Sequence, residues 1–443
     1  MVTGNPTQLN WGRRLVQRII CPTCWHTFLP EQVLFAAKAQ MNDAVLGPNE
    51  YQRFLPDRFT VKGEALDPQG VATSQLACPR CHLNIAESLL EVPPLFISIV
   101  GSPASGKSYF LATMTWQLRS LLPRASLSFS DADPTANSAL MEYEQTLFLN
   151  PNPDRPTAIR KTEPNDSRLH KNITLDGVPV RLPVPLQFTV WPTSGHPNFT
   201  KPHRVGRVVV CYDNAGEACL PQPAEVYDLN SMVVRHLAES GVLLMLFDPA
   251  QDPRFKSHCR GDDPQLEHGM RPNSSQTAHL IRQEMILKEA AVRMRSYLGM
   301  SQRQRTTKPL VVVLTKFDML AEAAGVSIDT EPYEGVDGKS PFRMDIARVE
   351  RTSRAIEGLF REICPEFAAT AESLSEIVHY IPVSSFGCNS EYVKQVDSEK
   401  RDTSFCGIRP CNIHPKWVTV PLMYCMTKHA KVLLDQSSGM KPR

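Results

Sequence analysis

A glycine-rich turn between an apolar run and a helical pattern constrains the fold of this chain more than any other sequence feature. The run Leu95–Val100 leads into Gly101-Ser-Pro-Ala-Ser-Gly-Lys-Ser108, and the helical pattern begins at Lys107. Successive backbone amides of such a turn point inward, and with the positive end of the following helix they bind phosphate groups. The pattern therefore predicts an α/β domain with a phosphate-binding loop.

Two side chains at the end of this loop have specific expected roles. Lys107 would reach the β and γ phosphates of a nucleotide and stabilise the charge that develops during phosphoryl transfer. The Ser108 hydroxyl would ligate Mg²⁺, a hard cation that prefers oxygen ligands. The nucleotide contacts predicted in this region are Gly101, Ser102, Pro103, Ala104, Ser105, Gly106, Lys107, Ser108 and Tyr109.

The sequence after residue 92 alternates short apolar runs with helical patterns. We predict strands at Leu95–Val100, Leu186–Trp191, Val208–Tyr212, Val242–Phe247, Leu310–Thr315 and Ile377–Val383. We predict helices at Lys107–Leu122, Pro134–Leu149, Gln276–Leu298, Met344–Ile363 and Pro421–Leu434, and long loops at Asn150–Asn172 and Asp248–Asn273. Continuous apolar runs are typical of strands covered on both faces. The alternation therefore predicts a doubly wound, mostly parallel sheet.

Composition and charge exclude several classes of protein. Lys and Arg total 48 and Asp and Glu total 46, which gives a net charge of +2 and no strong field that would attract nucleic acid or an anionic membrane. Apolar runs such as Gly241–Phe247 fall far short of the roughly 20 residues that a membrane span needs. The N-terminus does not resemble a secretory signal. We therefore expect a cytoplasmic protein whose 12 cysteines are free thiols or metal ligands.

Two matching cysteine pairs precede the phosphate-binding loop. They are Cys21-Pro-Thr-Cys24 and Cys78-Pro-Arg-Cys81, and their spacing lets each pair of thiolates point at one ion. Four thiolates form the tetrahedral set that structural Zn²⁺ prefers, with no open position for catalysis. Reduced cysteines in a small β unit are the alternative, and a thioredoxin-like redox pair fits poorly because neither pair is distinguished as attacking or resolving.

Other potential metal ligands lack such spacing. His26 and His82 lie close after the two cysteine pairs and are spare ligands at most. The later cysteines are irregularly placed, and we interpret them as scattered thiols. They are Cys364, Cys388, Cys406, Cys411 and Cys425, with His414 among them.

Three further motifs follow predicted strands and indicate which nucleotide would bind. Asp213-Asn-Ala-Gly216 follows one strand, where Asp213 would hold Mg²⁺ through a water and the Gly216 amide would contact the γ phosphate. Thr315-Lys-Phe-Asp318 follows another strand. The Asp318 carboxylate can accept hydrogen bonds from the ring N–H and the amino group of guanine, and the stem of Lys316 packs on the base. This arrangement favours GTP over ATP.

The last of these motifs is a small-residue turn after the final predicted strand. Ser384-Ser385-Phe386 follows Ile381-Pro-Val, and a backbone amide of this turn would contact the guanine oxygen. An ordinary turn at a strand end is the alternative interpretation of this motif alone. The predicted contacts on the base side are therefore Thr315, Lys316, Asp318, Ser384, Ser385 and Phe386.

The four motifs, in this order, resemble the translation-factor and Ras-like (TRAFAC) class of P-loop GTPases over roughly residues 95 to 434. The pattern Thr-Lys-x-Asp replaces the commoner Asn-Lys-x-Asp, a variant that Rho-type members also carry. With the cysteine pairs, the chain is similar to poorly characterised bacterial GTPases that have an N-terminal zinc ribbon, some of them in predicted conflict or signalling gene clusters. The resemblance implies a Mg²⁺-dependent protein that hydrolyses GTP and acts as a switch toward a protein partner.

The resemblance also implies roles for residues between the motifs. The long spacings imply insertions at Asn150–Pro185 and Asp248–Ser275. A threonine of the first switch would contact Mg²⁺ and the γ phosphate, and among Thr157, Thr162 and Thr174 we favour Thr162. Glu217 stands where Ras-like members place the glutamine that orients the attacking water, and its negative charge there is unfavourable unless it is offset. The candidates for an arginine finger are Arg235, Arg254 and Arg260.

These observations predict three regions and leave alternatives for the function. Residues 1–92 form a zinc-ribbon-like domain with an insertion, residues 93–435 form a GTPase domain with long insertions near the switches, and residues 436–443 are a polar tail. One alternative is a GTP-binding scaffold with little or no turnover. Another is a P-loop ATPase with a nucleic-acid-binding zinc ribbon, which the near-neutral charge disfavours.

Overall fold

The chain forms two compact units in the computed structural model, which describes residues 15–159, 168–213, 232–260, 263–264, 266, 282–335, 342–394 and 404–429. The first unit comprises Met1–Leu95, Ser128–Asn137 and Ser167–Val210. The second comprises Phe96–Leu127, Ser138–Asp166 and Cys211–Arg443. The domain boundaries expected at residues 92 and 435 stay a prediction.

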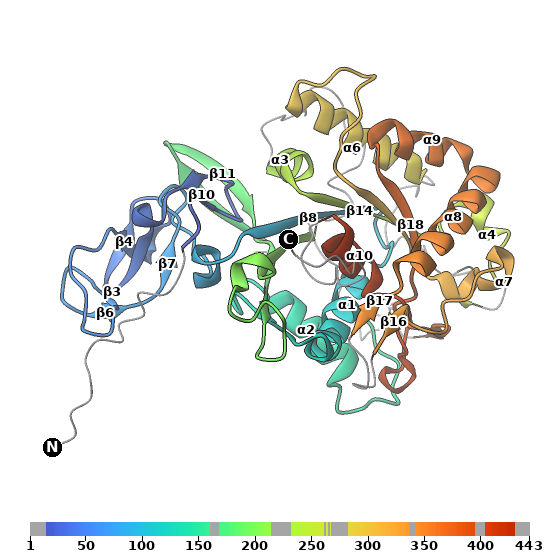
Figure 1. The fold of residues 1–443 in the computed structure, drawn as a ribbon, viewed down its shortest axis with the longest axis horizontal. Helices are drawn as coiled ribbons and strands as arrows, with labels where there is room; N and C mark the ends of the chain where they lie inside the picture. Colours follow the sequence, from blue (N-terminus) through green and yellow to red (C-terminus); the bar gives the residue numbers. More distant parts are fainter. Residues whose placement is uncertain are drawn as a thin grey trace, which may run out of the picture. The chain divides into compact units, whose positions relative to one another are not determined.

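A seven-stranded sheet is the largest β structure among the described residues (Figure 1). Its strand order is β18-β15-β14-β8-β13-β12-β9. In chain order the strands are β8 (Pro94–Gly101), β9 (Leu127–Asp131), β12 (Leu186–Pro192), β13 (Arg207–Asp213), β14 (Val242–Phe247), β15 (Leu310–Leu314) and β18 (Val378–Pro382). The pairs β8–β14, β14–β15 and β15–β18 are parallel. The fold is thus α/β with a large, mostly parallel sheet, which confirms the general class that the alternating pattern predicts.

The register of the parallel strands brings their carboxyl ends to one edge of the sheet. Leu246 of β14 pairs with Gly101 at the end of β8, and Phe247 pairs with Leu314 at the end of β15. Leu314 in turn pairs with Pro382 of β18. Because these four strands end within a residue of one another, the segments that follow them begin side by side.

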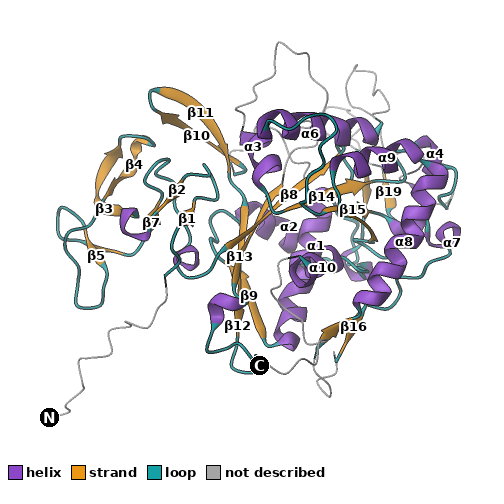
Figure 2. Cartoon of the chain, turned by 45° about the horizontal axis from the view of Figure 1, so that its top comes forward, coloured by secondary structure: helices purple, strands orange, loops and turns teal. Residues whose placement is uncertain are grey.

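Helices lie on both sides of the central strands of the second unit. Figures 1 and 2 show α3 (Met232–Glu239) and α6 (Gln283–Leu298) on one side of β8 and β14, and α1 (Lys107–Leu121) and α10 (Val420–Lys428) on the other. The remaining helices are α2 (Ser138–Phe148), α4 (Pro253–Lys256), α7 (Ala321–Ala324), α8 (Ile346–Ile363) and α9 (Pro365–Leu374). Within the described ranges, none of these helices is both long and apolar enough to cross a bilayer.

The predicted elements agree with the structure where the apolar pattern is strong. All six predicted strands of the sheet are confirmed to within one residue or so at each end. The five predicted helices are confirmed over their described parts, although α2 begins four residues later than predicted and the segments 276–281 and 430–434 lie outside the described residues. The elements that the sequence analysis missed include β9, α3 and α9.

The two predicted long loops are wrong in part. The first includes the start of a hairpin of β10 (His170–Leu175) and β11 (Val178–Pro183), and the second includes α4. Their residues 160–167, 261–262, 265 and 267–273 lie outside the described residues. The hairpin was missed because β10 is mostly polar and β11 is interrupted by two prolines and an arginine, so neither strand carries a continuous apolar run.

Short strands make up the N-terminal part of the first unit. A hairpin of β1 (Ile19–Ile20) and β2 (Thr27–Phe28) precedes a three-stranded sheet of order β4-β3-β7. Its strands are β3 (Leu34–Asp43), β4 (Gly47–Phe54) and β7 (Leu76–Ala77), and β5 (Ala65–Leu66) pairs with β6 (Ala72–Thr73). The cysteine pairs therefore lie at the turn between β1 and β2 and directly after β7.

A cluster of aromatic rings fixes the end of β14. The ring of Phe247 lies 5.0 Å from that of Phe255, 4.8 Å from that of Phe360 and 4.9 Å from that of Phe367, measured between centroids. Phe360 also contacts Tyr380 of β18. All five side chains are buried. Since buried aromatic rings contribute both area and specific edge-to-face contacts, the chain leaves β14 from a rigid base.

A histidine on the outermost parallel strand is half-buried and uncharged. The Nε2 atom of His379 lies 3.2 Å from that of His429, and its ring packs edge-on against Tyr424. Burial, followed by the nearby His429, lowers the pKa of His379 to about 4. The folded protein therefore holds this imidazole in its neutral form at pH values where an unfolded chain would protonate it.

We predict that His379 makes the protein less stable as the pH falls between 6.5 and 4. Below pH 6.5 the unfolded chain binds a proton at this residue and the folded chain does not, so the free energy of unfolding falls by about 2 kcal/mol between pH 7 and pH 5. The substitution His379→Gln should remove this part of the pH dependence in urea unfolding curves. The exposed His258→Gln is the control and should keep it; an unchanged slope in His379→Gln would contradict the prediction.

Candidate functional site

The two cysteine pairs fold into equivalent knuckles. In the first, the amide of Cys21 donates to the carbonyl of His26, and in the second the amide of Cys78 donates to the carbonyl of Leu83. Backbone amides also point at sulfur, at 3.4 Å from Thr23 N to Cys21 Sγ and at 3.4 Å from Arg80 N to Cys78 Sγ. Such amides stabilise negative charge on sulfur. Both knuckles are thus built to present thiolates.

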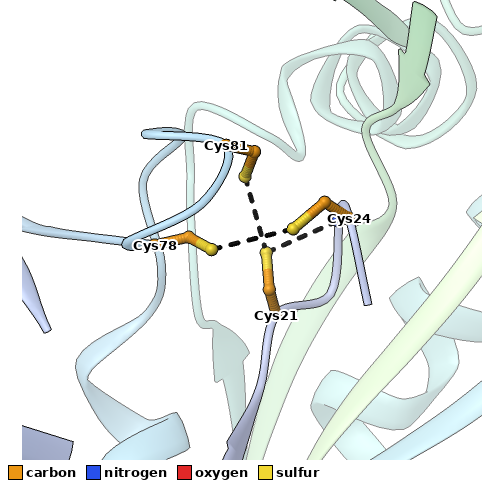
Figure 3. A group of neighbouring side chains, drawn as sticks. All are labelled: Cys21, Cys24, Cys78 and Cys81. Carbon is orange, nitrogen blue, oxygen red and sulfur yellow. Dashed lines mark hydrogen bonds between the residues drawn. The ribbon is translucent and has the colours of Figure 1, made fainter. Parts of the chain in front are cut away.

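The four sulfurs gather at one point (Figure 3). Cys21 Sγ lies 3.7 Å from Cys81 Sγ, and Cys24 Sγ lies 3.7 Å from Cys78 Sγ. All four sulfurs lie within 4.8 Å of one another, and all four residues are buried. A tetrahedral zinc ion with bonds of about 2.3 Å to sulfur would place its ligands about 3.8 Å apart. The donor set and its spacing therefore fit Zn²⁺.

The pKa values of two of these thiols shift in opposite directions. Burial raises the pKa of Cys21, while hydrogen bonds from the neighbouring thiols, first of all Cys21, lower the pKa of Cys24. The cluster thus favours a thiolate at Cys24 before any cation arrives, and a bound Zn²⁺ would deprotonate the others.

Neither histidine beside the knuckles belongs to this cluster. The Nδ1 atom of His82 lies 2.8 Å and 2.9 Å from the two carboxylate oxygens of Asp43, and His26 stacks on Phe28. Asp43 also accepts backbone hydrogen bonds from Val45, Leu46 and Arg53. This carboxylate therefore ties the second knuckle to the β3–β4 hairpin.

A second group of potential metal ligands surrounds an arginine. Asp252, Glu284 and Cys364 also offer atoms within 4.8 Å of one another. The guanidinium of Arg254 lies beside this group, with its Nη2 atom 2.8 Å from Asp252 and 3.6 Å from Glu284. A cation from the chain itself thus neutralises these carboxylates.

The glycine-rich loop leaves β8 at a point where a side chain does not fit. A Cβ atom on Gly101 would lie 2.9 Å from the carbonyl oxygen of Leu246 and 2.8 Å from Ser105 Oγ. Gly106 then takes a φ of +88°, a left-handed conformation that glycine adopts without strain, and α1 begins at Lys107. Strand, loop and helix therefore follow one another as the sequence pattern requires.

The residues predicted to hold phosphate and Mg²⁺ are brought together after this loop. The ammonium of Lys107 donates to the carbonyl oxygens of Gly101 and Ser102 at 3.1 Å and 2.9 Å. Ser108 Oγ donates to Asp213 Oδ2 at 3.4 Å, across 105 residues of chain. Burial raises the pKa of Asp213 to about 6. A carboxylate and a hydroxyl in contact at the end of a phosphate-type loop offer the oxygen ligands that Mg²⁺ prefers.

The predicted base-side residues are joined by a separate set of hydrogen bonds. Thr315 Oγ1 donates to the carbonyl oxygen of Ser105 at 3.3 Å, which ties this strand end to the glycine-rich loop. Ser384 Oγ donates to Asp318 Oδ1 and accepts from the amide of Gly387 at 2.8 Å. Burial raises the pKa of Asp318. The Asp318 carboxylate is thus hydrogen-bonded to the Ser384 turn, which lies 66 residues later in the sequence.

These residues line an open hollow of about 90 Å³. The predicted residues that line it are Ala104, Ser105, Gly106, Tyr109, Thr315, Lys316, Asp318, Ser384, Ser385 and Phe386. The rings of Tyr109 and Phe386 meet edge to face at 4.9 Å between centroids. The walls of this hollow combine apolar surface with a few fixed polar groups, as the walls of ligand sites do.

The sequence analysis missed other walls of this hollow. Cys388, Ser390, Cys406, Gly407 and Ile408 also line it. They belong to β19 (Glu391–Val393) and β20 (Phe405–Gly407) or lie beside this hairpin. Its residues carry no recognisable motif, so only the fold places them here. The interpretation of Cys388 and Cys406 as scattered thiols stays a prediction, but both line the pocket.

The predicted switch residues fall partly outside the described residues, among them Thr162, Gly216 and Glu217. Thr157 forms a bridge with Ile408, and Thr174 lies in β10. Two of the arginines are held in ion pairs, Arg254 as above and Arg260 with Glu322 at 2.9 Å.

A comparison with known proteins gives a partial match. No protein family model matches the chain. A stretch of 175 residues is 27% identical to a protein of Mycolicibacterium smegmatis named "Putative ESX-1 scaffolding and assembly protein SaeC". The match covers 39% of this chain and 37% of that relative, so more than half of each protein lies outside it.

We predict that the protein binds about one zinc ion through the four cysteines, since a closed Cys₄ set holds a single tetrahedral ion. The double substitution Cys78→Ser/Cys81→Ser removes one knuckle and should abolish zinc retention after washing with a weak chelator, measured by elemental analysis. Cys259→Ser, which changes a partly buried thiol of the second unit, is the matched control. Zinc retained at full occupancy by the double variant would contradict the prediction.

Proposed function

We propose that this protein binds GTP with Mg²⁺, hydrolyses it and acts as a nucleotide-controlled switch toward a protein partner. The observation that carries the proposal is the meeting of the glycine-rich loop, the Thr315–Asp318 strand end and the Ser384–Phe386 turn around one hollow. All three segments belong to the second unit. Such a site would combine phosphate binding with recognition of a planar base.

The base side supports guanine over adenine. An ionised Asp318 offers two acceptor oxygens, which match the ring N–H and the amino group of guanine. Adenine presents a ring acceptor where guanine presents its N–H, so a carboxylate there would repel it. The Ser384 hydroxyl and the Gly387 amide fix the direction of this carboxylate.

The phosphate side would supply charge and metal ligands. Lys107 would exchange its two loop carbonyls for phosphate oxygens, and the amides of the loop would face the same phosphates. Ser108 would bind Mg²⁺ directly and Asp213 through a water. Hydrolysis would further involve Thr162 and Glu217, and for these two residues the proposal rests on the sequence pattern alone.

The proposed partner is a protein. A closed Cys₄ zinc site has no catalytic position, so the N-terminal part of the first unit would serve as a structural or docking module. The partial similarity to a protein named for scaffolding and assembly agrees with such a role.

We predict that Asp318→Asn reduces the affinity for GTP about 100-fold and creates affinity for xanthosine triphosphate. The asparagine amide donates a hydrogen bond where the carboxylate accepted one, and xanthine offers a carbonyl in place of the guanine amino group. Fluorescent nucleotide titrations with Mg²⁺ measure both affinities, and Lys107→Ala should weaken the binding of either nucleotide.

The exposed Asp329→Asn is the matched control for this experiment, because it makes the same chemical change away from the hollow. Equal affinities for GTP and ATP in the unmodified protein would overturn the guanine assignment. A preference for ATP would revive the alternative of a P-loop ATPase.

A GTP-binding scaffold with little turnover is the second candidate. Two observations favour it: the carboxylate of Glu217 at the position where Ras-like GTPases have glutamine, and the name of the partial relative. We predict that Glu217→Gln raises the rate of phosphate release if the carboxylate opposes hydrolysis by repelling the γ phosphate. Single-turnover phosphate release measures this rate. Rapid release by the unmodified protein, lost in Glu217→Gln, would exclude the scaffold.

A further inference from the structure

The turn from Asp248 to Gln251, directly after β14, contacts both halves of the proposed nucleotide site. Asp248 Oδ2 lies 2.6 Å from the ammonium of Lys316, and the two residues are 68 positions apart. The Asp248 side chain is fully buried, whereas that of Lys316 is 20% exposed and lines the hollow. This ion pair therefore anchors the far end of a side chain whose stem faces the proposed base.

Asp248 is itself held by hydrogen bonds on every polar group. Its amide donates to Gln283 Oε1 at 2.9 Å, and its carbonyl oxygen accepts from Gln283 Nε2 at 2.8 Å. Its other carboxylate oxygen, Oδ1, accepts from the amide of Ala250 at 2.9 Å. Gln283 at the start of α6 is fully buried. The carboxylate that meets Lys316 is thus fixed in position before any ligand binds.

The other end of the turn holds the glycine-rich loop. Gln251 Oε1 accepts from Ser102 Oγ at 2.6 Å, and Gln251 Nε2 donates to the carbonyl oxygen of Pro103 at 3.0 Å. Both contacts fall on the part of the loop that precedes the helix. The side-chain amide of Gln251 thus uses its acceptor on the Ser102 hydroxyl and its donor on the Pro103 carbonyl, which fixes one side chain and one peptide group of the loop.

We propose that the turn Asp248–Gln251 is a positioning element of the nucleotide site, in which Asp248 acts through Lys316 on the base and Gln251 acts through the loop on the phosphates. This inference rests on the proposed function and adds to it two residues that no motif marks. A ligand would meet a lysine stem and a phosphate loop that are both fixed by one turn, which lowers the entropy lost on binding.

The position of the Lys316 stem depends on the anchor at its far end. Lys316 has a φ of +51° in the left-handed region, at the start of the short helical turn Phe317–Met319. Its four methylene groups can form a flat apolar wall only while the ammonium is held. Without Asp248 the ammonium would turn to solvent, and the stem would leave the wall.

The two residues should have separable effects on the two parts of a nucleotide. With a fluorescent GDP analogue and Mg²⁺, we expect Asp248→Asn to raise the dissociation constant about tenfold. We expect the affinity for inorganic triphosphate to change less than twofold. This affinity is measured by displacing the fluorescent analogue and is corrected for the weaker binding of the analogue to the variant. Gln251→Ala should weaken both ligands by a similar factor, because it acts on the phosphate loop alone.

A double-mutant cycle tests whether Asp248 acts through Lys316. In a Lys316→Met background, Asp248→Asn should cause no further loss of GDP affinity. Asp329→Asn is the matched control, since it breaks another ion pair of 2.6 Å, with Lys416, and should change neither ligand's affinity. Thermal unfolding without nucleotide shows whether each variant is folded. If Asp248→Asn unfolds the protein, Asp248→Glu, which keeps the charge but moves the carboxylate by one methylene group, replaces it in the same cycle.

Two results would overturn the inference while leaving GTP binding intact. One is an unchanged GDP affinity in folded Asp248→Asn or Asp248→Glu. The other is an equal loss of GDP and triphosphate affinity in either Asp248 variant. If the unmodified protein binds no GDP analogue at all, the proposed function itself fails, and the inference fails with it.

Discussion

In-register pairing of four parallel strands is the constraint on which the rest of the second unit depends. Gly101 pairs with Leu246, Phe247 pairs with Leu314, and Leu314 pairs with Pro382. The segment that follows each strand therefore begins at the same edge of the sheet. A shift of one residue in any pair would turn the side chains of that strand to the opposite face and separate the loop, the turn and the two strand ends. The aromatic rings around Phe247 resist such a shift.

Much of this arrangement could be predicted from the sequence because burial on two faces leaves a strong local signal. Strands such as Val242–Phe247 and Leu310–Leu314 are apolar at every position, and the turn at Gly101 carries a pattern with a known geometric requirement. The strand β9 was not predicted because it has only two apolar residues, Leu127 and Phe129, which alternate with serines. So short an alternation also occurs in polar loops. The helix α9 escaped because Pro365 follows α8 after a single residue, and only the fold shows a second helix starting there.

The residues that could not be predicted owe their place to contacts between distant parts of the chain. Asp248 meets Lys316 across 68 positions, and Gln251 meets Ser102 across 149. Aspartate is common in the turn after a strand, so the residue type alone does not indicate which side chain Asp248 contacts. The hairpin β19–β20 reaches the hollow for the same reason. By contrast, the four zinc-type ligands could be paired from sequence, because the short spacing within each knuckle already places two sulfurs together.

The zinc-type cluster also closes a loop of 54 positions between Cys24 and Cys78. The entropy lost on closing a loop grows only with the logarithm of its length, so the closure places little limit on how many residues lie between the knuckles. Provided Asp43 keeps its contact with His82 and the strands beside the knuckles keep their pairing, the exposed parts of this loop can change in length or surface without disturbing the sulfurs. The exposed parts of the loop can therefore be replaced, in evolution or by design, while the two cysteine knuckles stay unchanged.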